Sequence, residues 1–167
     1  GLDRTLVPLY HALGAPARAW APAARVVASA PGDVDARAAL IGLAEQLGRP
    51  KELAQLLGDA LAAQRQAGAP PVELWAMATE LAHRVAADPQ TRGGAEKAWM
   101  TVLELEPDDA EAFAALAALY RSGARWDDLR ALLERRVAVA TAPAVQLAAL
   151  LELTTLDEDV LGDPGRA

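Results

Sequence analysis

Apolar residues recur at spacings of three and four along almost the whole chain, which is the pattern of amphipathic helices. The segments DAEAFAALAALYRS (109–122) and WDDLRALLERRVAVA (126–140) show it most clearly. Asp108 and Asp109 stand where a carboxylate would cap the first helix, and Gly123 permits a turn before the second. These segments predict a helical hairpin. Runs rich in β-branched and aromatic residues, which would predict strands, are absent from the sequence.

The hairpin pattern repeats with a period of 34 residues. Tyr10 and Gly14 correspond to Ala44 and Gly48, 34 positions later. In the third unit the spacing is longer by four residues, and the extra length falls near Ala87–Gly94, a segment with Pro89 and two glycines. We expect an irregular connection there. Further prolines punctuate the unit boundaries, at Pro31, Pro70, Pro71, Pro107 and Pro143.

The period predicts nine helices in a single array over residues 1–167. The expected units are 1–33, 34–71, 72–109, 110–143 and 144–167, the last of them incomplete. Its second helix should begin at Ala167, which leaves the apolar residues Leu147, Leu150 and Leu151 without a covering helix. We therefore expect the parent protein to continue, and we expect self-association through this unit as an alternative use of the exposed end.

Several positions of the third and fourth units match a known repeat motif. They are Trp75, Ala78, Ala82, Ala95, Trp99 and Pro107 in the third unit, and Phe113, Leu116, Tyr120, Leu129 and Leu133 in the fourth. On these residues the chain resembles the tetratricopeptide repeat family, as a fragment of a longer bacterial-type repeat protein. Ile41 and Arg136 depart from the small residues usual at their positions. The resemblance implies an all-α fold, an α-α superhelix built as a solenoid of antiparallel hairpins. It also implies a concave face, lined by the first helix of each unit, that binds proteins or peptides.

Projecting the repeat onto that face gives candidate partner-binding residues that are mainly acidic. They are Asp35, Glu45, Gln46, Glu73, Glu80, His83, Arg84, Glu111 and Arg121. Small residues lie between them and replace the Lys, Asn and Arg with which some members of the family grip a carboxylate. An acidic face favours a partner that carries Lys or Arg. Because exposed carboxylates contribute little to stability, we expect their removal to leave the fold intact.

The net charge of −7 and the pI near 4.8 argue against nucleic acid as a partner, because phosphate binding needs clustered basic residues. The sequence has no apolar run of the roughly 18 residues that a membrane span needs. The absence of cysteine fits a reducing or an oxidising compartment. Localisation therefore stays open, with the cytoplasm favoured.

Nothing in the sequence pairs a nucleophile with a base or spaces residues as metal ligands. His11 and His83 are far apart, and their ordinary interpretation is as helix-surface residues. The acidic run Asp157–Asp159 lacks the spacing of a calcium loop and is explained as a solvated helix end. We expect Trp75 and Trp99 to pack in the core, whereas Trp20 either packs on a neighbouring unit or is exposed. We predict no catalysis, no metal and no cofactor.

The sequence thus predicts a non-catalytic scaffold that holds a peptide or a partner domain in its concave face. Two alternatives remain: a structural spacer or self-association module, and the regulatory arm of an enzyme encoded elsewhere in the parent chain.

Overall fold

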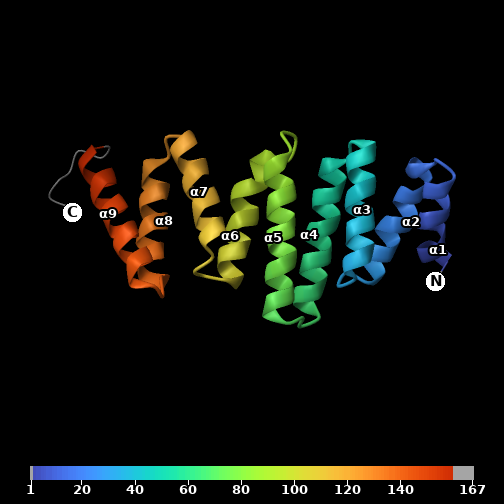
Figure 1. The fold of residues 1–167 in the computed structure, drawn as a ribbon, viewed down its shortest axis with the longest axis horizontal. Coiled ribbons are helices and arrows are strands. Elements are labelled where there is room, and N and C mark those ends of the chain that lie inside the picture. The colour runs from blue at the N-terminus through green and yellow to red at the C-terminus, as the bar shows by residue number, and fades with distance from the viewer. Residues whose placement is uncertain (1, 160–167) are drawn as a thin grey trace. The chain divides into compact units, whose positions relative to one another are not determined.

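The computed structural model describes residues 2–159 (Figure 1). Over these residues the chain forms nine α-helices and one short 3-10 helix, without strands. This confirms the predicted all-α fold of consecutive helical hairpins. The α-helices are α1 Leu2–Ala12, α2 Pro16–Ser29, α3 Val34–Leu47, α4 Pro50–Gln66, α5 Pro71–Ala87, α6 Ala95–Leu105, α7 Ala110–Ser122, α8 Trp126–Val139 and α9 Pro143–Asp159, with the 3-10 helix η1 at Arg92–Gly94.

The chain divides after Ala98, within α6, into two compact units. In unit 1, α2 packs on α1 and α3, and α4 packs on α3 and α5. In unit 2, α8 packs on α7 and α9 (Figure 1). Packing between chain neighbours is the arrangement of helical repeat proteins. The first helices α3, α5, α7 and α9 begin within one residue of the expected unit starts, but the single array over residues 1–167 stays a prediction.

The core consists mostly of alanine and leucine. Ala19, Ala82 and Ala112 are fully buried, as are the larger Leu40 and Leu116. Small side chains let neighbouring helices approach closely, while the leucines supply most of the apolar area removed from water. Trp99 lies in the core as predicted, and the open question about Trp20 is resolved because it is 8% exposed. Trp75 is only half-buried, since Leu74 and Met77 take the buried face of α5, so its core assignment was wrong.

Aspartate side chains begin the first helices of two hairpins. Asp33 accepts a hydrogen bond from the Ala36 amide at 3.0 Å, and Asp109 accepts one from the Ala112 amide at 2.8 Å. Both satisfy amides that the helix itself leaves without acceptors. Asp108 has a different role from the predicted cap. Its Oδ2 accepts from the backbone amide and the hydroxyl of Thr141, at 3.1 and 3.0 Å, and so ties the start of α7 to the end of α8.

An ion pair joins the first two helices. Arg25 on α2 donates to both carboxylate oxygens of Asp3 on α1, at 2.7 and 3.1 Å. This hydrogen bonding, together with the positive charge of Arg25, lowers the pKa of Asp3 below its ordinary value of 3.8. Because Arg25 is exposed and Asp3 is only half-buried, the pair contributes little to stability.

The third unit has the irregular connection that the sequence predicted. Helix α5 ends at Ala87, and η1 leads into α6. Between them the Thr91 hydroxyl donates to the Val85 carbonyl oxygen at 2.9 Å, and the Gln90 amide donates to Asp88 Oδ1 at 2.7 Å. The connection is therefore held by hydrogen bonds within its own few residues.

The turn between the helices of each compact hairpin uses one left-handed residue at a fixed position. Gly14 and Gly48 adopt φ of 64° and 63° at this position in the first two units. In the fourth unit the equivalent residue, four after Tyr120, is Ala124, with φ of 50°. Gly123 has an ordinary φ of −92°, so its assignment as the turn glycine was wrong by one residue. An alanine in this conformation places its Cβ close to the carbonyl oxygen, at a cost of about 1 kcal/mol.

Replacing Ala124 with glycine should therefore increase the free energy of unfolding by about 0.5–1 kcal/mol, because glycine adopts positive φ without steric cost. The matched control is Gly123→Ala, whose new Cβ would meet only ordinary contacts, the nearest being the Leu119 carbonyl oxygen at 3.5 Å. Chemical denaturation of the two variants and the parent chain checks the expectation. Destabilisation by Ala124→Gly would contradict the assignment of the strained position, whereas Gly123→Ala, at an ordinary φ, should be neutral or stabilising.

Candidate partner-binding site

In unit 1 the candidate residues lie on two first helices, α3 and α5. Asp35, Glu45 and Gln46 are exposed on α3, and Glu73 and His83 are exposed on α5. The two remaining candidates of this unit, Glu80 and Arg84, are half-buried on α5. Thus the predicted positions are surface positions, but not all of them are equally open to a partner.

Two ion pairs connect α3 with α5 and involve three of these candidates. The Arg84 guanidinium pairs with Glu45, and Arg37 Nε lies 3.2 Å from Glu80 Oε2. The structure therefore brings Glu45, Glu80 and Arg84 to the facing sides of the two helices. It also neutralises two of the carboxylates expected to form an acidic wall.

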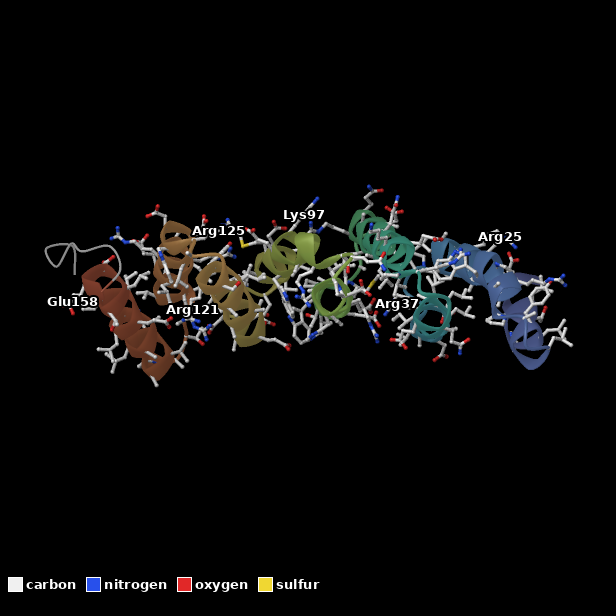
Figure 2. All side chains as sticks on the ribbon, turned by 90° about the horizontal axis from the view of Figure 1, so that it is seen from above. Arg25, Arg37, Lys97, Arg121, Arg125 and Glu158 are labelled. Carbon is white, nitrogen blue, oxygen red and sulfur yellow. The ribbon has the colours of Figure 1, made fainter. Side chains whose placement is uncertain are left out.

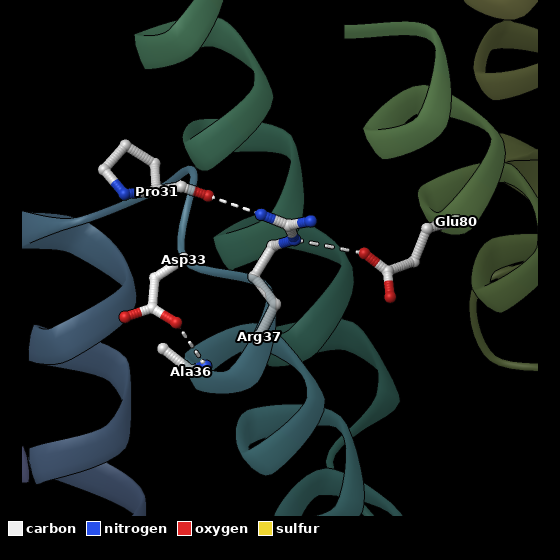
Figure 3. A network of polar contacts seen from close by, with 5 residues as sticks. All are labelled: Pro31, Asp33, Ala36, Arg37 and Glu80. Carbon is white, nitrogen blue, oxygen red and sulfur yellow. Dashed lines mark hydrogen bonds and ion pairs between the residues drawn. The ribbon is translucent and has the colours of Figure 1, made fainter. Parts of the chain in front are cut away.

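Arg37 is the centre of the larger network (Figure 3). The residue is only 7% exposed, and its Nη1 donates to the Pro31 carbonyl oxygen at 2.8 Å. Figure 3 shows its guanidinium lying between Pro31, in the connection before α3, and Glu80 on α5. One side chain thus joins that connection to both first helices. A buried guanidinium needs such partners, because leaving it unpaired costs several kcal/mol.

Arg37 was not among the predicted site residues, although the repeat pattern contains a signal for it. Arg37 lies seven residues before Ala44, just as Trp75 lies seven before Ala82 and Phe113 seven before Tyr120. The position is aromatic in the third and fourth units, and in the first it holds Asp3, which pairs with Arg25 on the neighbouring helix. A charged residue there therefore predicts a partner on a neighbouring helix. The identity of that partner, 43 residues further along the chain, was not readable from the period.

A hollow of about 210 Å³ lies beside the Glu45–Arg84 pair. Its walls come from α3, α4 and α5, with Ala44, Leu53 and Ala87 among the apolar contributors. The ion pair forms part of this lining, so a ligand entering the hollow would meet both charges.

Unit 2 carries the other two candidates, Glu111 and Arg121, both exposed on α7. Arg121 forms an ion pair with Glu152 on α9, which again joins two first helices. Figure 2 shows Arg121 on one side of the unit 2 helices and Arg125 on the other. Unit 2 therefore repeats, with different residues, the ion pairing between first helices seen in unit 1.

A larger groove, of about 460 Å³, lies between α7, α8 and α9. Its apolar lining is formed by Phe113, Ala117, Leu132, Leu133, Val145 and Ala149. The Arg121–Glu152 pair belongs to its wall, as does Arg136 of α8. The Arg136 guanidinium carbon lies 4.6 Å from the centre of the Phe113 ring. The groove thus combines an apolar surface with one stacked guanidinium.

In the acidic run at the end of α9, which was predicted to be a solvated helix end, Glu158 is exposed but Asp157 is not. Asp157 is 1% exposed, and its Oδ1 lies 3.3 Å from Arg130 Nε on α8. The end of α9 thus lies against α8 in an ion pair whose aspartate is buried and whose arginine is 24% exposed. The side chains of His11 and Asp159, and the helix start expected at Ala167, lie outside the described residues.

The apolar residues of α9 expected to lack a covering helix are indeed exposed, Leu147 by 57%, Leu150 by 44% and Leu151 by 62%.

In the part of the chain that the structure describes, no helix is long and apolar enough to cross a membrane. Within the same residues, no group of three or more His, Cys, Asp or Glu side chains is placed to hold a metal ion.

Comparison with known proteins finds similarity to cellulose synthase operon protein C of Pseudomonas fluorescens (strain SBW25), at 30% identity over 110 residues. The matched segment covers 66% of this chain but only 9% of that protein. No family model matches the chain.

The Arg37 network changes the expected effect of removing a groove carboxylate. Glu80→Gln should lower the free energy of unfolding by about 1–3 kcal/mol, because it leaves a buried guanidinium with a weaker acceptor. Glu73→Gln, on the exposed side of the same helix, should change it by less than about 0.5 kcal/mol. Urea denaturation of the two variants provides the comparison.

Adding Arg37→Met to the Glu80→Gln variant should restore part of the loss, because no buried guanidinium then remains to be paired. If Glu80→Gln and Glu73→Gln have equal effects, Arg37 does not depend on Glu80, and the network in Figure 3 is not what stabilises this part of unit 1.

Proposed function

We propose that the chain is a tetratricopeptide-like, non-catalytic scaffold that binds segments of a partner protein along the first helices of its hairpins. The observation that carries this proposal is the repeated hollow between the first helix of one hairpin, its second helix and the first helix of the next. One such hollow occurs in each unit, between α3, α4 and α5 and between α7, α8 and α9. Hollows of this kind accept side chains of a bound segment without rearrangement of the backbone.

The surface chemistry of unit 1 favours a partner with Lys or Arg. Of the candidate carboxylates, Glu45 and Glu80 are already paired with arginines. Asp35 and Glu73 are exposed and have no ion pair within residues 2–159. These two carboxylates retain the negative field that would steer a basic segment to the face, an effect on the association rate more than on affinity.

Replacing the pair, as Asp35→Asn with Glu73→Gln, should slow association with the partner and flatten its dependence on salt, while the fold stays intact. The first measurement is affinity capture from an extract of the source cell, at low and at high salt, quantified by mass spectrometry. The second is the association rate of the chain with the protein that is captured. The matched control removes two exposed carboxylates from second helices, Asp59→Asn on α4 and Asp127→Asn on α8.

The control separates a local effect from the general effect of a smaller net charge. Equal capture by both double variants and the parent chain at low salt would reject the scaffold proposal for this face. The spacer or self-association alternative would then be favoured, with the exposed leucines of α9 as the contact surface. If the captured protein were instead an enzyme whose activity changes on binding, the chain would be favoured as the regulatory arm of an enzyme.

The similarity to a protein named for a cellulose synthase operon supplies a defined set of candidates for the capture experiment. We propose as first candidates the products of genes that lie beside the parent gene, with particular attention to any that encode polysaccharide synthesis. Recovery of one of these proteins by the unsubstituted chain, but not by the Asp35→Asn, Glu73→Gln variant, would connect the scaffold with polysaccharide synthesis.

A further inference from the structure

The unit 2 groove has the length and lining for a short extended segment. Its α7 wall runs from Phe113 to Arg121, which corresponds to about 12 Å along the helix. An extended chain covers this length with three or four residues. Ala114, Ala144 and Ala148 along the walls leave room for a backbone to enter, and the apolar lining offers a site for at least one aliphatic side chain.

Arg136 gives the groove its polar specificity. One face of its guanidinium is stacked over the Phe113 ring, which leaves its N–H groups directed outward in the guanidinium plane. Within residues 2–159 no carboxylate pairs with Arg136.

The other charges of the groove cancel one another. Arg121 and Glu152 form an ion pair, so the groove has one uncompensated positive charge although the whole protein carries −7. A carboxylate brought beside Arg136 can accept two hydrogen bonds from the guanidinium edge. A Lys side chain at the same place would be repelled. The charge of this groove therefore favours an acidic segment, whereas unit 1 is expected to bind a basic one.

We propose that the unit 2 groove binds an extended partner segment in which an aliphatic side chain stands next to Asp or Glu. The aliphatic side chain lies against Ala144, Val145 and Ala148, the open part of the lining, and the carboxylate binds Arg136. This inference rests on the proposed scaffold function and assigns a partner chemistry to one part of it.

The test uses three short peptides, each capped at both ends, with the cores Leu-Asp-Leu-Asp, Leu-Lys-Leu-Lys and Ser-Asp-Ser-Asp. Binding to the whole chain is followed by NMR of labelled alanine methyl groups. The Leu-Asp peptide should shift the methyl signals of Ala114, Ala144 and Ala148 in a saturable manner. The other two peptides should bind at least about tenfold more weakly, since each lacks one of the two interactions.

Two pairs of variants locate the site. Ala148→Leu fills the groove and should abolish binding, whereas Ala131→Leu, exposed on α8 outside the groove lining, should not. Arg136→Gln should weaken binding by about tenfold or more and remove its salt dependence. Its control is Arg125→Gln, because Arg125 also stacks on an aromatic ring, 4.8 Å from the Tyr120 centre, but does not line the groove.

The inference is overturned if the Leu-Asp peptide leaves the groove methyl groups unshifted at millimolar concentration, if the Leu-Lys peptide binds equally well, or if Ala148→Leu binds like Ala131→Leu. Thermal unfolding of each variant separates loss of binding from loss of folding. Capture of the partner from cell extract, repeated with Ala148→Leu, distinguishes the two proposals. Unchanged capture without peptide binding would leave the scaffold function standing and remove only the assignment of this groove.

Discussion

The close approach of consecutive helices, made possible by buried alanine, is the constraint on which the rest of the structure depends. Ala19, Ala82 and Ala112 have no exposed surface, so no larger side chain fits at these contacts without displacing a neighbouring helix. The helices contact chiefly their neighbours in the chain, although α2 also contacts α4. Stability is then the sum of local interfaces, which explains how one chain can form two compact units, each with its own core.

The period of 34 residues was sufficient to predict the helices, because the apolar positions that repeat are the ones buried in each hairpin. Capping by Asp33 and Asp109 and the irregular connection after α5 follow from local chemistry and were equally accessible from the sequence. The turn at Ala124 was mislocated because glycine is only the usual solution to positive φ, and the repeat position, which is the better guide, was outweighed by residue type.

The ion pairs between first helices were not predictable, for a physical reason. Arg37 and Glu80 lie on helices that are not consecutive, and their contact depends on the rotation of each helix and on side-chain rotamers. The sequence shows which residues are charged but not which of them form ion pairs. The prediction therefore overestimated the negative charge that the unit 1 candidates present to a partner. It likewise treated Asp157 as solvated, although that carboxylate is buried against Arg130. Net charge describes the field far from a protein, whereas a partner segment in contact with the surface meets the charges that pairing has left over.

The connection between α5 and α6 closes through its own hydrogen bonds, from Thr91 to Val85 and from Gln90 to Asp88. Its conformation is therefore held by hydrogen bonds to its own residues and to the last turn of α5. Such a loop is a place where evolution can lengthen or shorten a repeat without disturbing the stack, since the entropic cost of a longer loop grows only slowly. The same local closure makes it a suitable position for inserting a reporter domain or an affinity tag.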